Sequence, residues 1–287
     1  MTGRLISVGS VVVDVLAAVP GLPARGGDVW ASRMQLSAGG GFNAMAAAAR
    51  QGVPVLYAGA HGTGPFGDLA RAALRAEGID VHLAPRADLD TGLVIALVDD
   101  GGERTFVSGR GAETTLGPAD LADLRPDPGD VVLVSGYGLD DALAGWVSAL
   151  PDAVVVALDP GPLASSGPLA HVRPRLDWVS ANAAEAAALT GEADPMSAAA
   201  ALVGRAGAVV RTGARGCVLT VTDAEPLEVP GVVVEVVDTT GAGDTHTGVF
   251  LAALLQGSAQ EEAARRANRA AADSVTRPGP ATAPHAR

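Results

Sequence analysis

The stretch Asp238-Thr239-Thr240-Gly241-Ala242-Gly243-Asp244 separates two apolar runs of different character. The run before it, Val232 to Val237, is rich in β-branched residues and predicts a strand. The run after it, Gly248 to Leu255, favours a helix. Glycines between a strand and a helix let the backbone approach a ligand, and the free N–H groups that open a helix attract anions. By itself the stretch indicates either a helix cap or a phosphate site.

Asp244 falls in the first turn of the predicted helix. A carboxylate beside bound phosphate is repelled unless it serves a purpose, and accepting a proton from an attacking hydroxyl is one such purpose. The helix dipole lowers the pKa of this residue and burial raises it. We expect Asp244 to be ionised at neutral pH.

The composition excludes several classes of protein. The length of 287 residues fits one large α/β domain as well as two smaller ones, and a net charge of -12 argues against binding to nucleic acid or anionic lipid. All 20 basic residues are arginine. Without lysine, a Walker-A site, a protein kinase site and a Schiff-base nucleophile are all excluded.

The cysteine content and the hydropathy pattern predict the compartment. Cys217 stands alone in an apolar run, so we expect a buried side chain, no internal disulfide and a reducing environment. No apolar stretch approaches the roughly 18 residues of a spanning helix. We therefore expect a soluble, cytoplasmic protein with no membrane partner.

The N-terminal half predicts strands that alternate with glycine-rich turns. The apolar run from 5 to 13 predicts a strand covered on both faces, and Asp14 follows it, where open α/β sheets bind ligands. A second strand is predicted over 29–36. Gly39, Gly40 and Gly41 then form another backbone cradle before a helix, and Asn43 either caps that helix or contacts a substrate hydroxyl.

Two further features lie between residues 62 and 113. Gly62 to Gly67 matches the G-x-G-x-x-G dinucleotide pattern, but the expected ribose-binding acid at the end of the next strand is missing. Residues 91–98 and 103–108 predict a hairpin in a sheet outside the main core, such as a lid. Arg110 closes this hairpin and is a candidate contact for an anionic substrate.

From residue 131 onward, strands and helices alternate regularly, which predicts a largely parallel sheet. Asn182 and Glu185 stand three residues apart at the start of a helix, as in a capping box. The same pair could also order the water shell of Mg²⁺. The glycine turn from Gly213 to Gly216 connects two predicted strands, and Asn268 lies in a later alanine-rich helix.

Taken in this order, the motifs resemble the ribokinase-like (PfkB) family of carbohydrate kinases over essentially the whole chain. The most specific part is Asp238 to Asp244, which is similar to the C-terminal signature of the family, whereas 38–43 is similar to the N-terminal one. The resemblance implies one domain over 1–287, with a three-layer α/β core and a small β-sheet lid. The lid would come from segments at about 14–38 and 88–113.

The resemblance also implies an ATP- and Mg²⁺-dependent phosphorylation of a hydroxymethyl group. Asp244 would be the base, and Gly241, Ala242 and Gly243 the anion hole. The remaining implied contacts are Asp14, Gly39, Gly40 and Asn43 for the sugar, Gly213, Gly216 and Asn268 for the nucleotide, and Asn182 and Glu185 for Mg²⁺. Asp238 and the loop near Gly279 would hold a monovalent cation such as K⁺.

Two residues depart from the family pattern. His246 stands where many members carry Phe, and we expect it to pack. Arg211 stands where Thr often precedes the glycine turn, and we expect it to face the nucleotide phosphates.

Three alternatives to the sugar kinase stay open. They are a nucleoside kinase of the same fold, a non-catalytic sugar or nucleotide sensor, and a dinucleotide oxidoreductase at Gly62 to Gly67. The scarcity of aromatic residues, 3% of the chain, argues mildly against nucleoside binding. An exposed edge of the lid sheet would pair two copies, so we expect a homodimer.

Overall fold

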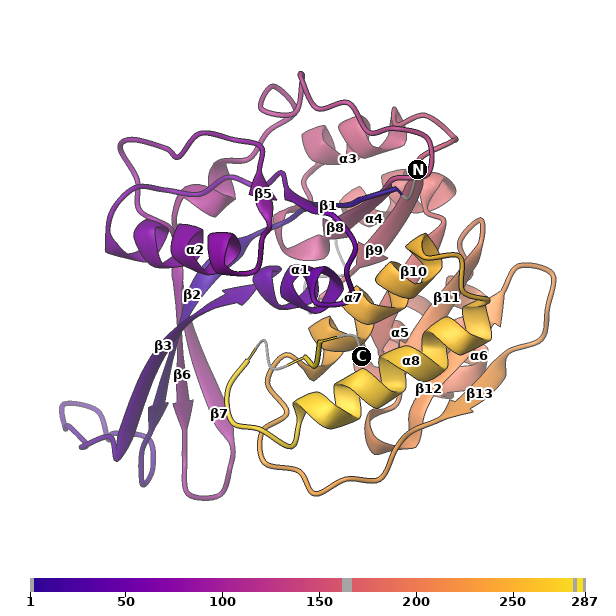
Figure 1. The fold of residues 1–287 in the computed structure, drawn as a ribbon. Helices are drawn as coiled ribbons and strands as arrows, with labels where there is room; N and C mark the ends of the chain where they lie inside the picture. Colours follow the sequence, from indigo (N-terminus) through magenta and orange to yellow (C-terminus); the bar gives the residue numbers. More distant parts are fainter. Residues whose placement is uncertain (1–2, 162–166, 281–282, 286–287) are drawn as a thin grey trace.

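The strands of the described residues, 3–161, 167–280 and 283–285, form one sheet of nine strands and one of four (Figure 1). Residues 1–2, 162–166, 281–282 and 286–287 of the expected domain lie outside these ranges of the computed structural model. The large sheet has the order β13-β12-β11-β10-β9-β8-β1-β4-β5, and the small sheet has the order β3-β2-β6-β7.

The large sheet is mostly parallel. A short antiparallel edge follows its seventh parallel strand, β11. Its apolar strands are buried on both faces, as expected where helices cover a parallel sheet on both sides. The parallel strands are β1 (Leu5–Val8), β4 (Val55–Tyr57), β5 (Asp80–Val81), β8 (Val131–Ser135), β9 (Val155–Asp159), β10 (Trp178–Asn182) and β11 (Gly207–Arg211), and the antiparallel ones are β12 (Gly216–Val221) and β13 (Leu227–Pro230).

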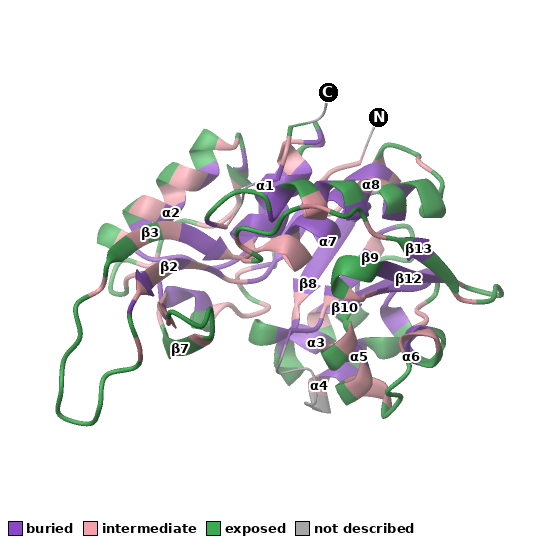
Figure 2. Ribbon diagram, turned by 90° about the horizontal axis from the view of Figure 1, so that it is seen from below, coloured by how far each residue is buried: buried purple, intermediate pink, exposed green. Residues whose placement is uncertain are grey.

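Helices cover both faces of the large sheet, and alternate residues of each strand pack against opposite layers. Leu5 belongs to one apolar cluster and Ile6 to the other. The first layer contains α1 (Phe42–Ala49), α2 (Pro65–Ala76), α7 (Ala242–Leu255) and α8 (Gln260–Ser274), and the second contains α3 (Asp141–Ser148), α4 (Gly167–Val172), α5 (Ala183–Thr190) and α6 (Pro195–Leu202). The expected three-layer α/β fold is confirmed. Figure 2 shows α7 buried within it.

The small sheet stands beside the core and contains the predicted hairpin. Its strands are β2 (Val11–Ala18), β3 (Arg33–Gly40), β6 (Leu93–Val98) and β7 (Arg104–Gly109). The pair β6 and β7 is antiparallel, as expected. Short 3₁₀ turns also occur at η1 (Ala112–Thr115), η2 (Gly136–Gly138), η3 (Arg173–Arg175) and η4 (Gly213–Arg215). Among the described residues, no helix is long and apolar enough to cross a membrane.

The prediction of one strand over 5–13 is wrong, because the chain changes sheets at Gly9 and Ser10. β1 belongs to the large sheet and β2 to the small one. The Tyr57 hydroxyl fixes this junction, accepting from the Val11 N–H at 3.2 Å and donating to the Ala60 carbonyl at 2.9 Å. Asp14 therefore lies in the middle of β2 and does not follow a strand.

The predicted strand over 232–237 is also wrong. The last strand ends at Pro230, and the chain then runs without regular structure to α7. Val233 is 97% exposed. β-branched residues favour strands because they fit a half-buried pleated surface, but none of the described strands pairs with this segment. Likewise, the strand predicted over 29–36 begins only at Arg33.

Candidate active site

Three polar residues, of which Asn182 and Arg211 were predicted as site residues, meet at one edge of the large sheet. Asp159, Asn182 and Arg211 are the last residues of the neighbouring strands β9, β10 and β11. Asn182 is directly paired with Arg211 in the register of β10 and β11. In open α/β sheets this carboxyl edge is where ligands bind.

Helix α7 begins at the same edge with the glycine-rich stretch. Gly241 is its N-cap and has φ +75°, a left-handed conformation that glycine adopts without strain. The Thr245 N–H makes the first helical bond, to the Gly241 carbonyl at 2.8 Å. The N–H groups of Gly243 and Asp244 therefore precede the hydrogen-bond ladder and are available to an anion.

Asp244 is partly buried in the first turn of α7 and contacts the N-terminal signature. Asn43 of α1, 201 residues earlier, donates from Nδ2 to Asp244 Oδ2 at 3.1 Å. Asn43 does not cap its helix, because the N-cap is Gly41. Burial, reinforced by the nearby charge of Asp159, raises the pKa of Asp244 to about 7, against the opposing effects of Asn43 and Arg211. The expectation of full ionisation at neutral pH is therefore wrong.

Arg211 lies between the sheet edge and the start of α7. Its Nη1 donates to the hydroxyls of Ser180 at 2.6 Å and Thr247 at 2.9 Å. Its guanidinium lies 3.6 Å from Asp159 and 3.5 Å from Glu185. A Cβ at Gly243 would be 3.4 Å from its Nε. This places a positive charge directly beside the glycine-rich turn.

Asn182 and Glu185 form the predicted capping box at the start of α5. Asn182 Oδ1 accepts from the Glu185 N–H at 2.9 Å, and Glu185 Oε2 accepts from the Asn182 N–H at 2.8 Å. Burial raises the pKa of Glu185, and Asp159 raises it further, whereas the Asn182 N–H and Arg211 lower it. One pair of residues thus caps α5 and also lies beside the Arg211 guanidinium.

A cavity lies between the small sheet and the loop that precedes α7. Asp14 of β2 reaches it, and burial raises the pKa of Asp14 to about 6. Gly39 is required beside this carboxylate, because a Cβ there would be 1.9 Å from Asp14 Oδ2. Gly40 has φ +60°. The other residues that line the cavity are Leu16, Gln35, Ser37, Val94, Ala96, Arg104, Phe106, Thr240 and Pro280.

The glycine turn and Asn268 lie near the antiparallel edge. Gly213 has φ +66°, and a Cβ at Gly216 would be 2.3 Å from the Val229 carbonyl, so the turn packs closely against β13. Asn268 is 5% exposed and donates to the carbonyls of Val229 at 3.0 Å and Pro230 at 3.1 Å. The amide of Asn268 therefore supports this edge from inside.

His246 packs as expected and is linked to the same edge. It is 3% exposed, and its Nε2 lies 3.1 Å from Asn268 Oδ1. Burial lowers its pKa to about 3, so the imidazole is neutral.

Arg110 and Asp238 occupy different surroundings. Arg110 is exposed just after β7 and does not line the cavity. Asp238, before the glycine-rich turn, accepts from the N–H groups of Thr240 at 2.9 Å and Gly279 at 3.0 Å. The predicted meeting of Asp238 with the loop near Gly279 therefore occurs, but Arg104 of β7 also reaches this carboxylate, at 2.8 Å.

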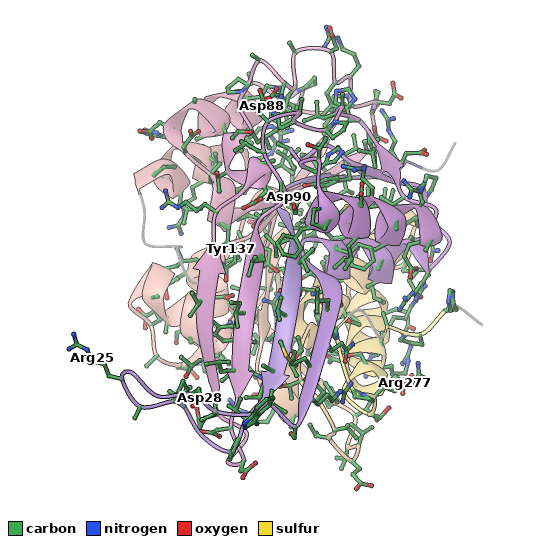
Figure 3. All side chains as sticks on the ribbon, turned by 90° about the vertical axis from the view of Figure 1, so that its left-hand side faces the viewer. Arg25, Asp28, Asp88, Asp90, Tyr137 and Arg277 are labelled. Atoms are coloured by element: carbon green, nitrogen blue, oxygen red, sulfur yellow. The ribbon has the colours of Figure 1, made fainter. Side chains whose placement is uncertain are left out.

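The G-x-G-x-x-G segment does not present a free anion cradle. The N–H groups of Phe66 and Gly67 donate to the two Asp90 carboxylate oxygens at 3.2 Å and 2.7 Å. Figure 3 marks Asp90 at the end of the small sheet. Because a carboxylate of the chain already occupies this helix start, the dinucleotide alternative is rejected.

Sequence reasoning did not select Arg104, Ser180 or Thr247 as site residues. Thr247 lies one helical turn after Asp244, so its spacing was a usable signal. Ser180 and Arg104 carry no comparable signal, because their approach to the site depends on strand register and on how the two sheets meet.

The arrangement is that of an α/β protein whose large sheet ends, at its carboxyl edge, in a glycine-rich helix start beside a largely buried arginine, with a second, smaller sheet next to it. The sequence pattern of the pfkB family carbohydrate kinases matches residues 2–287, so the chain belongs to that family.

Known relatives and solved structures agree. The chain is 33% identical over 265 residues to the uncharacterized sugar kinase YegV of Escherichia coli, covering 87% of this chain and 81% of the relative. It is 31% identical over 293 residues to the ATP-dependent ribose-1-phosphate kinase of Halopiger xanaduensis, covering 99% of this chain and 95% of that relative. The structure of Arabidopsis thaliana ribokinase complexed with ribose and ATP superposes with a TM-score of 0.83 at 25% identity, covering 99% of this chain and 96% of the ribokinase chain. The predicted enzyme class, an ATP-dependent carbohydrate kinase, is confirmed.

Proposed function

We propose that this kinase transfers the γ-phosphoryl group of ATP to a hydroxymethyl group of a sugar or sugar-like alcohol, with Asp244 as the general base. The observation that carries the proposal is the partly buried Asp244 carboxylate, whose pKa is raised to about 7, at the start of α7. A base with a pKa near the working pH combines a large ionised fraction with adequate proton affinity. Asn43 orients the carboxylate by its hydrogen bond.

The backbone of Gly241, Ala242 and Gly243 would form the anion hole. The support for this role is the left-handed N-cap at Gly241 and the helix start that follows it. N–H groups fixed in this way stabilise charge that develops on the transferred phosphoryl group without reorganising. The glycine at 243 also keeps the approach to the Arg211 guanidinium open.

The phosphates of ATP would lie between α7 and the ends of β9, β10 and β11. Arg211 would neutralise phosphate charge in place of lysine, because its guanidinium lies beside Gly243 at the start of α7. Gly213 and Gly216 would lie along the nucleotide, and Asn268 would hold the adjoining edge.

The residues at this edge fit Mg²⁺ held through water. Mg²⁺ usually takes one or two carboxylates together with substrate phosphates and several waters, and Glu185, with Asp159 beside it, offers oxygen ligands of this kind. Among the described residues no group of three or more His, Cys, Asp or Glu could hold a metal ion by itself. Bound with ATP, Mg²⁺ would neutralise phosphate charge, while Asn182 and Glu185 would order its waters.

The sugar would occupy the cavity beneath the small sheet. Asp14 and Asn43 would accept or donate hydrogen bonds to its hydroxyls, and Gly39 and Gly40 would let the backbone approach it. The cavity combines polar side chains with apolar walls, which suits a ligand with hydroxyl edges and C–H faces. Arg110 remains a proposed contact only for an anionic substrate that extends past β7.

A nucleoside is the second candidate substrate, and one observation favours it. Phe106 of β7 is an aromatic side chain in the cavity wall, and aromatic rings stack on bases. The sensor alternative loses its basis because the chain belongs to a family of kinases.

The exposed apolar side chains of the small sheet support a homodimer. Met34 and Leu36 of β3 are 64% and 50% exposed, and Val107 of β7 is 58% exposed. Large apolar side chains gathered on one sheet mark an interaction surface. A cytoplasmic location accords with ATP as substrate and with a single buried cysteine.

The test is a screen for substrate-dependent ADP release in the presence of MgATP. The panel holds ribose, ribose 1-phosphate, other pentoses and hexoses, and nucleosides. With the best substrate, Asp244→Asn should lower turnover by about 10²- to 10⁴-fold and leave the Kd of ATP nearly unchanged. Near-full turnover of this variant would remove Asp244 from the role of base, and rapid turnover of nucleosides alone would replace the sugar assignment.

A further inference from the structure

An ion pair crosses from the small sheet to the loop that precedes the anion hole. Arg104 is the first residue of β7, and its Nη2 lies 2.8 Å from Oδ1 of Asp238, 134 residues later in the chain. Both partners are largely shielded, since their side chains are 29% and 14% exposed. The pair is therefore less screened by solvent than an ordinary surface ion pair.

The Asp238 carboxylate has both oxygens engaged by the chain itself. Oδ1 accepts from Arg104 and from the Thr240 N–H at 2.9 Å, and Oδ2 accepts from the Gly279 N–H at 3.0 Å. Burial acts to raise the pKa of Asp238, but the bonds from Thr240 and Gly279 and the charge of Arg104 together hold it below its ordinary value. The carboxylate is thus ionised, hydrogen-bonded and charge-neutralised.

This arrangement does not fit the monovalent cation that the family resemblance implied at Asp238. A metal ion bound to the same carboxylate would lie beside the Arg104 guanidinium. Two positive charges held on one carboxylate are close enough to repel each other. It would also compete with N–H groups that point their hydrogens at the oxygens. Within the part of the chain that the structure describes, Arg104 forms an ion pair with Asp238 and already supplies a positive charge there.

Arg104 also belongs to the wall of the substrate cavity, together with Asp14 and Thr240. A second lid residue approaches the same loop, because Gln35 Nε2 lies 3.2 Å from where a Cβ at Gly279 would be. Contacts from β7 and β3 therefore converge on the two segments, around Asp238 and Gly279, that flank the anion hole. The position of the lid and the charge balance at this loop are linked through Arg104.

We propose that Arg104 provides from the lid the positive charge expected of a monovalent metal ion at Asp238, so that this enzyme works without K⁺. This inference rests on the proposed function, because the loop that Arg104 neutralises leads into the proposed anion hole. Arg104 is a positioning residue, since it acts on Asp238 and on the loop that carries Thr240 and Gly241. The charge that fixes the loop before the anion hole then comes from the same sheet that lines the proposed sugar cavity.

The experiment compares the wild type with Arg104→Met and Arg104→Lys, each in KCl and in tetramethylammonium chloride at equal ionic strength. Arg25→Met is the matched control, because Arg25 lies exposed on the β2–β3 connection and points away from the core (Figure 3). The rate of substrate-dependent ADP release and the thermal midpoint with MgATP are both measured. The midpoint needs no sugar substrate, so it tests this inference even if the proposed function fails.

We expect the wild type, Arg25→Met and Arg104→Lys to differ by less than about twofold in rate between the two salts. Arg104→Met should lose at least about tenfold in rate without K⁺, recover severalfold with K⁺, and show a midpoint that rises with KCl alone. A wild-type rate that K⁺ raises tenfold would overturn the inference. The inference would also be overturned if K⁺ changed neither the rate nor the thermal midpoint of Arg104→Met. If Arg104→Met does not fold, the response of the wild type and Arg104→Lys to K⁺ decides.

Discussion

Replacing Asp244 by Asn should stabilise the folded protein increasingly as the pH rises. Burial raises the pKa of Asp244 from its ordinary value of 3.8 to about 7. Between these values the folded chain keeps a proton that the unfolded chain has released. The folded state therefore loses stability through this group as the pH rises from about 4 to above 7, and an uncharged Asn escapes this loss.

The size of the effect follows from the shift in proton affinity. Each tenfold change in that affinity is worth about 1.4 kcal/mol. For a fully desolvated Asp244, the free energy of unfolding would therefore fall by about 4 kcal/mol once the pH exceeds the folded-state pKa. Asp244 keeps some exposure, and we therefore expect roughly 2 kcal/mol between about pH 5 and pH 9. For a chain of this length that corresponds to about 4–8 °C in the midpoint.

The assay is urea unfolding followed by circular dichroism at several pH values, with no nucleotide or sugar present. Asp88→Asn is the control, because it removes a carboxylate from an exposed loop (Figure 3). We expect the free energy of unfolding of Asp244→Asn, relative to the wild type, to grow with pH more than that of the control. A difference that is constant from pH 5 to pH 9 would refute the reasoning that burial makes this carboxylate costly to ionise.

Two further predictions concern charge and packing. Arg211→Met should raise the KM for ATP by about tenfold or more, because it removes the guanidinium beside the proposed anion hole. Steady-state kinetics at varied ATP would check this, and an unchanged KM would place Arg211 outside the proposed phosphate site. Gly248→Ala should lower the free energy of unfolding by about 1–3 kcal/mol, because its Cβ would be 2.1 Å from the Ala44 carbonyl where α7 crosses α1. Chemical denaturation measures this loss. An unchanged free energy of unfolding would mean that α1 and α7 can move apart at this contact without losing packing energy.

The core could be predicted from the sequence where one local pattern determined one element. The apolar strands from Val131 onward alternate with helices, and their order in the chain is their order in the sheet. The run from 5 to 13 gave a wrong strand because both sheets bury its residues, so hydropathy does not mark the change of sheet at Gly9. The valines from 232 to 237 show the opposite failure, since strand propensity without a neighbouring strand forms no sheet.

The candidate site was predictable where motifs came in a recognisable order. Asn43 and Asp244 are 201 residues apart and were both selected, and their side chains are hydrogen-bonded. Arg104 could not be found in this way. Its contact with Asp238 depends on where β7 begins and on how the small sheet meets the core, and no local pattern in the sequence encodes either.

The burial of Cys217 makes the surface of this enzyme unusually easy to label. The thiol is 2% exposed in β12, and burial raises its pKa to about 12, so little nucleophilic thiolate is present for a maleimide to modify. The chain also contains no lysine for amine-reactive dyes. One cysteine introduced on the tip of the β2–β3 connection and one on α6 would therefore carry a fluorophore pair against almost no background. Energy transfer between them would then follow the lid of a single molecule during turnover.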